Sequence, residues 1–201
     1  MLSVRDLASP VFGPVSLDVA AGECVAVMGA SGAGKSLLLR AIADLDPNDG
    51  DVALNGIARN AMPANAWRRQ VGLVPAESGW WADIVGEHFI AAPPDMDLLE
   101  ALGLAAESLT WTVARLSSGE RHRLAILRAL SLRPKALLLD EPSASLDETA
   151  TEKLEAVLAG RRAAGVPIVL VTHDAAQAER LATRIITMAG GRMAGQRDAA
   201  T

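Results

Sequence analysis

The sequence predicts an α/β fold built on a parallel central sheet, and three observations support this prediction. Short apolar runs typical of strands alternate with helical segments, which is the pattern of parallel strands joined by helices on both faces of a sheet. One such run, Glu23–Met28, is followed by a glycine-rich turn and then by a helical segment. The chain of 201 residues is 50% hydrophobic but only 3% aromatic, so its core must be built mainly from aliphatic side chains.

Residues 1–75 predict short strands, two turns and one helix. Apolar residues recur at helical spacing over Lys35–Leu45, so this segment is expected to be a helix. Proline, glycine and aspartate residues mark turns at Pro10–Pro14 and Asp46–Gly50. The apolar runs between these signals predict strands at Leu2–Val4, Val15–Val19, Glu23–Met28, Asp51–Asn55 and Gln70–Val74.

The remaining residues divide into a helical stretch and a second alternation of strands and helices. From Ala76 to about Leu132 the pattern is helical but irregular, and Pro93 and Pro94 interrupt it, so we interpret this stretch as an insertion into the sheet domain. Further helices are expected at Glu148–Ala163 and Ala175–Ala182. Further strands are expected at Lys135–Leu139, Pro167–Val171, Arg184–Met188 and Arg192–Gly195.

Charge and composition argue against several classes of protein. A formal net charge of −5 argues against a broad nucleic-acid-binding surface. Cys24 is the only cysteine, so an intrachain disulfide is excluded and a reducing compartment is expected. No apolar run approaches the ~18 residues of a membrane-spanning helix, and Arg5 and Asp6 stand where a signal peptide needs apolar residues. We therefore expect a soluble, cytoplasmic protein that reaches a membrane only through a partner.

Eight consecutive residues form a candidate phosphate-binding loop between a strand and a helix. Glycines allow backbone N–H groups to surround a phosphate without Cβ clashes, and the helix N-terminus adds the positive end of its dipole. Lys35 would contact the β- and γ-phosphates, the Ser36 hydroxyl would coordinate Mg²⁺, and Leu37 completes the expected ATP-binding set. The loop matches G-x-x-x-x-G-K-[ST] and consists of Gly29, Ala30, Ser31, Gly32, Ala33, Gly34, Lys35 and Ser36.

Two acidic residues follow the apolar run Ala136–Leu139. A buried strand delivers such side chains to the ligand crevice at the carboxyl edge of an α/β sheet. Asp140 would hold Mg²⁺ through water, and Glu141 would polarise the water that attacks the γ-phosphate. Without the phosphate loop, two ordinary acids at the end of a strand would be an equally good interpretation.

The segment Leu116–Arg123 resembles the signature sequence of ATP-binding cassette (ABC) ATPases, which is L-S-G-G-Q followed by a basic, a variable and a basic residue. The order of motifs is also similar to that of the family, and the resemblance covers nearly the whole chain. It implies a phosphate-loop NTPase with a parallel central sheet, a small antiparallel β subdomain and a short inserted α-helical subdomain. One domain over residues 1–201 is implied, with 1–75 and 133–201 as the nucleotide-binding core and 76–132 as the helical subdomain.

The resemblance also implies roles for individual residues. Two cassettes are expected to pair head-to-tail around two ATP molecules, so that the signature of one chain contacts the γ-phosphate bound by the other. Asp147 is expected to communicate across this dimer, and His173 to contact the γ-phosphate. Phe12, the only aromatic residue before the loop, either stacks on adenine or packs locally in a turn. The signature positions are Ser117, Ser118, Gly119 and Glu120.

Three positions depart from the pattern of the family. Ser118 replaces a glycine and Glu120 replaces a glutamine, and both changes are mild. Ala76 replaces a glutamine that in this family contacts Mg²⁺ and the attacking water. An alanine can do neither, so the neighbouring Glu77 is a candidate metal ligand.

The short interval after Ala76 also carries adjacent tryptophans, which either belong to the core or form an exposed docking pair for a membrane subunit.

Together these features predict an ATP-hydrolysing subunit that uses ATP and Mg²⁺ and powers a membrane transporter. Its expected partners are a second copy of itself and a separate transmembrane permease, at the inner face of the cell membrane, and no nucleic acid. One alternative is a soluble ABC ATPase acting in a complex unrelated to transport. Another is an ATP-binding module that barely hydrolyses ATP because of Ala76, although Glu141 and His173 argue against it.

Overall fold

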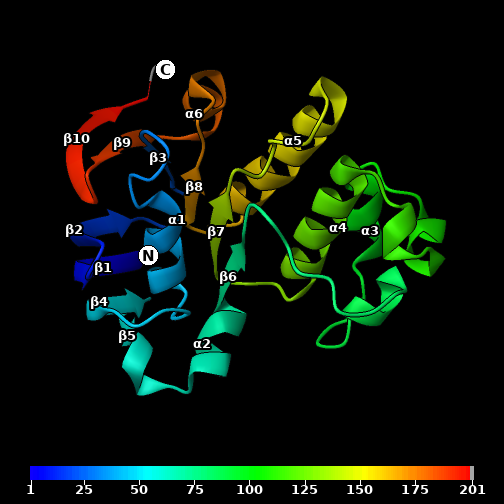
Figure 1. The fold of residues 1–201 in the computed structure, drawn as a ribbon, viewed down its shortest axis with the longest axis horizontal. Coiled ribbons are helices and arrows are strands. Elements are labelled where there is room, and N and C mark those ends of the chain that lie inside the picture. The colour runs from blue at the N-terminus through cyan, green and yellow to red at the C-terminus, as the bar shows by residue number, and fades with distance from the viewer. Residues whose placement is uncertain (200–201) are drawn as a thin grey trace.

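The central sheet of the protein has six strands, in the order β10-β9-β3-β8-β7-β6. The computed structural model describes residues 1–199 and is shown in Figure 1. All neighbouring pairs in this sheet are parallel except β9 and β10, which form an antiparallel hairpin at one edge. The strands are β3 (Cys24–Met28), β6 (Val71–Val74), β7 (Ala136–Asp140), β8 (Ile168–Val171), β9 (Arg184–Ala189) and β10 (Arg192–Asp198). The predicted parallel sheet is thus confirmed.

A second, antiparallel sheet has the order β2-β1-β4-β5. Three of its strands are longer than the sequence patterns predict, and two of them begin inside predicted turns, because β1 pairs with β2 and β4 through bulges that the patterns do not reveal. Gly50 makes this pairing tight, since its φ is +95° and an added Cβ would lie 2.5 Å from the carbonyl oxygen of Asp6. The strands are β1 (Leu2–Ser9), β2 (Phe12–Val19), β4 (Asp49–Leu54) and β5 (Ile57–Ala58).

The helices include one that the sequence does not predict, α2. It carries Trp67, which is fully buried and donates its indole N–H to the Ile42 carbonyl oxygen at 2.9 Å. The first helix ends earlier than predicted, because Asp44 adopts a left-handed backbone conformation with φ +60°. The α-helices are α1 (Lys35–Ile42), α2 (Ala64–Gln70), α3 (Met96–Ala101), α4 (Ser118–Ser131), α5 (Glu148–Ala163) and α6 (Ala175–Leu181). Short 3₁₀ turns occupy Arg59–Ala61, Val85–His88, Ala106–Thr110 and Val113–Arg115.

Two hydrophobic clusters cover the two faces of the central sheet. Alternation along β3 divides its side chains between them: Val25 and Val27 belong to one cluster, Cys24 and Ala26 to the other. The first cluster also contains α1 and the antiparallel sheet, so α1 lies between the two sheets (Figure 1). The second contains buried residues of α3, α4, α5 and α6. This packing fixes the N-terminus of α1 beside the carboxyl ends of the parallel strands.

None of the helices within residues 1–199 combines the length and the apolar character that crossing a lipid bilayer requires.

Candidate functional site

A cleft of about 460 Å³ lies at the carboxyl ends of β3, β7 and β8, beside the N-terminus of α1. This is where ligands bind in open α/β sheets. The cleft brings together the predicted phosphate loop, both acids of the β7 strand end and His173. Its lining consists of Gly29, Ser31, Gly32, Ala33, Gly34, Lys35, Ser36, Leu37, Ala76, Asp140, Glu141, Val171 and His173.

The loop before α1 depends on its glycines. Gly29, Gly32 and Gly34 have φ values of 149°, 76° and 95°, which side chains with a Cβ rarely adopt. A Cβ at Gly29 would also lie 2.2 Å from the carbonyl oxygen of Met188 in β9. Gly34 precedes α1 without a side-chain cap, so side chains do not occupy the first N–H groups of the helix. The loop therefore offers backbone donors to an anion.

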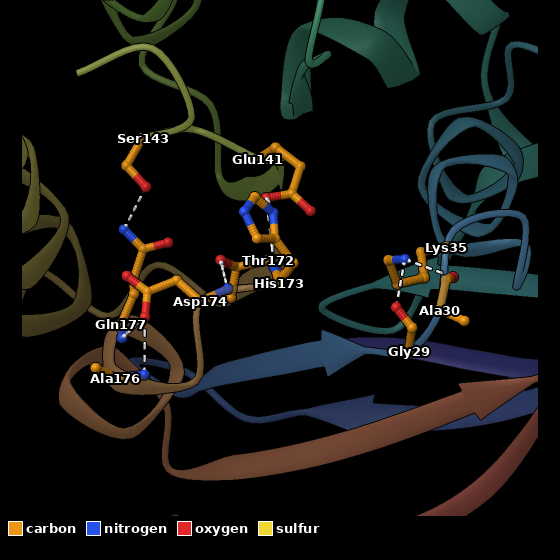
Figure 2. A network of polar contacts seen from close by, with 10 residues as sticks. All are labelled: Gly29, Ala30, Lys35, Glu141, Ser143, Thr172, His173, Asp174, Ala176 and Gln177. Carbon is orange, nitrogen blue, oxygen red and sulfur yellow. Dashed lines mark hydrogen bonds and ion pairs between the residues drawn. The ribbon is translucent and has the colours of Figure 1, made fainter.

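Lys35 places its charge over this same loop. Its Nζ donates hydrogen bonds to the carbonyl oxygens of Gly29 at 2.9 Å and Ala30 at 3.0 Å, as Figure 2 shows. The ammonium group is thus held at the cleft by two backbone acceptors, and phosphate oxygens are stronger, charged acceptors for it.

The acids at the end of β7 lie in different environments. Asp140 is 7% exposed and lines the cleft together with Ser36. Glu141 has a left-handed backbone conformation, with φ +50°, that costs on the order of 1–3 kcal/mol. This conformation directs its carboxylate to His173, whose Nδ1 lies 2.7 Å from Glu141 Oε2 (Figure 2). The two predicted catalytic side chains therefore form a pair at the mouth of the cleft.

A network behind this pair was not predicted from the sequence. Asp174 Oδ1 accepts hydrogen bonds from the backbone N–H groups of Ala176 and Gln177 and thereby caps α6. Gln177 is fully buried, and its Nε2 donates to Ser143 Oγ at 2.9 Å, two residues after Glu141 (Figure 2). The network connects the segment after β7 to the helix that follows His173. A glutamine among alanines was the only signal of this contact in the sequence.

The signature residues lie outside the phosphate cleft of their own chain. Ser117 is the N-cap of α4: its Oγ accepts from the Glu120 backbone N–H at 3.2 Å, and Glu120 Oε2 accepts from the Ser117 N–H at 2.9 Å. These hydrogen bonds from Ser117 lower the pKa of Glu120. A Cβ at Gly119 would lie 3.0 Å from the Ser145 carbonyl oxygen, so glycine allows α4 to approach the segment after β7.

Three further predicted residues have specific places in the structure. Asp147 caps α5 by accepting a hydrogen bond from the Ala150 N–H at 2.8 Å. Ala76 lines the phosphate cleft, as its sequence position predicts. Glu77 instead lines a neighbouring cleft of about 280 Å³ with Ser118. Ala76 lines this second cleft as well, so the two clefts adjoin at Ala76, and a role of Glu77 at the metal site stays a prediction.

Phe12 belongs to the hydrophobic core. It is 5% exposed and packs in the cluster that contains α1 and the antiparallel sheet. The neighbouring Val11 is 66% exposed. Of the two alternatives considered for Phe12, local packing describes the structure.

The adjacent tryptophans differ from each other. Trp80 packs partly buried against the second core cluster, whereas Trp81 is 63% exposed. Both lie against the guanidinium of Arg128, at 5.0 Å and 4.8 Å from the ring centroids. Trp80 thus belongs to the core and Trp81 is exposed, and the docking role considered for the pair stays a prediction.

A polyphosphate is the ligand that matches this cleft, because the glycine loop, Lys35 and the end of α1 all supply donors or positive charge, while a carboxylate pair faces them. The fold and the site therefore define a phosphate-loop nucleoside triphosphatase. More particularly, the chain belongs to the ABC transporter family, whose model matches residues 12–144. It is an ATPase of that family, as the resemblance implied.

Comparison with known proteins gives the same assignment. The chain is 40% identical over 202 residues to a cobalt import ATP-binding protein of Rhodobacter capsulatus, covering 92% of this chain and 72% of that one. It is 36% identical over 222 residues to a putative ABC transporter ATP-binding protein of Halobacterium salinarum, covering 100% and 94% of the two chains.

Solved structures confirm the fold. The structure of an ATP-binding subunit of an ABC transporter superposes with a TM-score of 0.89 at 27% identity, covering 98% of this chain and 89% of that one. A dimeric ATP-binding cassette bound to ADP and phosphate has the same fold, with a TM-score of 0.87 at 23% identity and full coverage of both chains.

Proposed function

We propose that the protein is the ATP-hydrolysing subunit of a membrane transporter and works by ATP-driven head-to-tail dimerisation. The observation that carries this proposal is the separation of the signature from the phosphate cleft on one chain. Ser117 and Ser118 are exposed at the N-terminus of the 14-residue helix α4, where the capping box engages the N–H groups of Ser117 and Glu120 and leaves those of Ser118 and Gly119 for an anion. A second copy would bring this N-terminus to the γ-phosphate, so that each site needs both chains.

Within each site, the first chain binds the nucleotide. The loop N–H groups and Lys35 hold the β- and γ-phosphates by charge-assisted hydrogen bonds. The Ser36 hydroxyl and the Asp140 carboxylate are hard oxygen donors in one cleft, and this donor set fits Mg²⁺. When bound, the cation neutralises phosphate charge that develops during transfer.

Hydrolysis is assigned to the Glu141–His173 pair. Glu141 would accept the proton of the water that attacks the γ-phosphate. With its Nδ1 facing Glu141, His173 keeps that carboxylate in place and leaves Nε2 to contact the γ-phosphate. Asp147 stands at the N-terminus of α5, where it would pass the state of one site to the other across the dimer.

The proposed transporter partner is a separate permease in the cell membrane, with this chain on the cytoplasmic side. Both relatives named above carry ATP-binding-protein names, one for cobalt import and one for an ABC transporter. We further propose that residues 76–132 act as a helical subdomain that contacts the permease. A groove of about 260 Å³ lined by Trp81, His88, Phe89, Ile90 and Arg128 supports this role.

Mixing two inactive variants tests the shared site. Lys35→Ala removes phosphate binding, and Ser117→Arg blocks the signature, so each homodimer should hydrolyse little ATP. A mixed dimer has one site that combines an intact loop with an intact signature, so mixing should restore phosphate release that neither variant shows alone. Additive, unrestored rates in the mixture, with both variants folded by circular dichroism, would contradict a head-to-tail dimer.

A second candidate function, ATP binding with weak hydrolysis, is favoured by Ala76 in the cleft lining. If the absence of a glutamine at this position slows hydrolysis, Ala76→Gln should raise the steady-state ATPase rate. One hydrogen bond to water or metal contributes on the order of 1–3 kcal/mol, which corresponds to a roughly tenfold to hundredfold change in rate. Because Glu77 lines the neighbouring cleft, Glu77→Ala should change the rate and its Mg²⁺ dependence little. The opposite pattern, a severe loss in Glu77→Ala and no gain in Ala76→Gln, would mean that Glu77 has taken over.

A further inference from the structure

One wall of the groove proposed to contact the permease is the loop that follows β6. The groove lies beside α2, β6 and α4 (Figure 1). Trp81 and His88 both line it, and His88 ends the 3₁₀ turn Val85–His88 that closes the loop. Trp81 is 63% exposed, whereas His88 is only 3% exposed, and their rings are 4.6 Å apart. A buried imidazole therefore supports an exposed aromatic side chain of the groove.

Both ring nitrogens of His88 are engaged by the backbone of this loop. Nε2 accepts hydrogen bonds from the N–H groups of Trp81 at 2.9 Å and Ala82 at 3.1 Å. Nδ1 lies 3.1 Å from the carbonyl oxygen of Ile84 and 3.2 Å from that of Val85, so Nδ1 carries the hydrogen. The imidazole can close the loop only in this neutral form, because a proton on Nε2 would face two N–H donors.

The charges around the groove also oppose a proton on His88. Within residues 1–199, the arginines of the lining are Arg68 and Arg69 of α2 and Arg128 of α4, and no carboxylate lines the groove. Arg128 lies over both tryptophan rings that contact His88, so the attraction of these rings for a cation is already used. Burial lowers the pKa of the Arg128 guanidinium, so this surrounding already disfavours one positive charge.

Carboxylates on the neighbouring segments do not contact the His88 ring nitrogens. Asp83 and Glu87 stand on the loop itself, and Glu107 stands on the 3₁₀ turn Ala106–Thr110, which packs against the turn of His88. All three of these acidic residues are exposed. The four groups that the ring nitrogens contact are backbone groups, so no acid is placed to stabilise an imidazolium.

We propose that His88 is a pH-sensitive positioning residue of this groove, which holds the Trp80–Ala82 segment while neutral and releases it on taking up a proton. This inference rests on the proposed function, because it concerns the regulation of the same permease contact. A histidine in water changes charge near pH 6.5. If only the open loop takes up the proton, the closed loop is stable above that pH and loses stability as the pH falls. Acidification should therefore weaken the contact with the permease.

Hydrogen exchange measured by NMR on the full chain tests this inference without a permease. Protection of the Trp81 and Ala82 amides, corrected for the intrinsic exchange rate at each pH, should fall about tenfold from pH 7.5 to pH 5.5. Protection of the Leu102 amide, which donates to the Leu98 carbonyl oxygen at 3.0 Å, should stay constant. An equal fall at Leu102 would mean that residues 76–132 open as a whole. Constant protection at Trp81 and Ala82 would mean that no proton controls the loop, and either result would overturn the inference.

His88→Gln is the variant without a titrating group. A glutamine carbonyl oxygen can accept from the same two N–H groups and takes up no proton in this range, so the fall in protection should disappear. His122→Gln is the matched control, because His122 is also a buried histidine, 6% exposed, but lies on α4 outside the lining of the groove. It should keep the tenfold fall. A fall that persists in His88→Gln, or one that vanishes in His122→Gln, would overturn the inference.

The imidazole gives a second readout that does not depend on the variants. In the unmodified chain at pH 7.5, NMR of the His88 ring should find hydrogen on Nδ1 and none on Nε2. A hydrogen on Nε2 at that pH would overturn the inference, whatever the variants show. None of these results bears on the shared ATP site, which the mixing of Lys35→Ala with Ser117→Arg tests separately.

Discussion

Glu141→Gln should bind ATP, fail to hydrolyse it and accumulate as a dimer. The amide has the size of the carboxylate and retains an oxygen that can accept from His173 Nδ1, which faces Oε2 at 2.7 Å. The phosphate loop is unchanged, so the contacts that bring two chains together remain. Only the group that accepts the proton of water is lost, and general-base catalysis contributes on the order of a hundredfold to ten-thousandfold.

Size-exclusion chromatography with ATP and Mg²⁺ measures the dimer, and phosphate release measures the rate. Glu100→Gln is a matched control, because Glu100 is an exposed carboxylate on α3 outside the phosphate cleft. It should behave as the unmodified protein in both measurements. Hydrolysis by Glu141→Gln at the unmodified rate would show that another group activates the water.

Lys35→Ala should abolish measurable ATP binding. Its Nζ is positioned at the cleft by the carbonyl oxygens of Gly29 and Ala30, and a bound triphosphate would replace these with charged acceptors. Each charge-assisted hydrogen bond contributes about 1.5–3 kcal/mol. Two such bonds, to the β- and γ-phosphates, therefore correspond to a loss of at least a hundredfold in affinity, which isothermal titration calorimetry would record as absent binding.

Lys135→Ala provides the control for charge. Lys135 is exposed, precedes β7 and does not line the phosphate cleft. The Lys135→Ala substitution removes one positive charge from the chain, as Lys35→Ala does, and should leave the affinity for ATP unaltered. If both lysine variants bind ATP with unaltered affinity, the loop of residues 29–36 does not hold the β- and γ-phosphates.

The phosphate loop and the acidic strand end could be predicted because their chemistry is local. Positive φ angles at Gly29, Gly32 and Gly34 follow from the need to bend the backbone around a phosphate, and only glycine adopts them without strain. Period-two alternation and apolar runs likewise place β3 and β7 within one or two residues. The sequence patterns did not predict the short helix α2, because seven residues are too few to show a clear helical periodicity. The hydrogen bond from the Trp67 indole to the Ile42 carbonyl oxygen, which joins α2 to α1, is a tertiary contact.

The sequence by itself therefore determined the parallel sheet, the loop of residues 29–36 and the acids at 140 and 141, since backbone geometry dictates residue type at each of these positions. Only the tertiary structure decided which side chains meet. It turned Phe12 into the core and left Val11 exposed, because burial depends on where α1 packs between the sheets. It paired Glu141 with His173, residues 32 positions apart, and placed Glu77 in the lining of a cleft next to the phosphate cleft. Such contacts depend on the packing of distant elements, which no local pattern encodes.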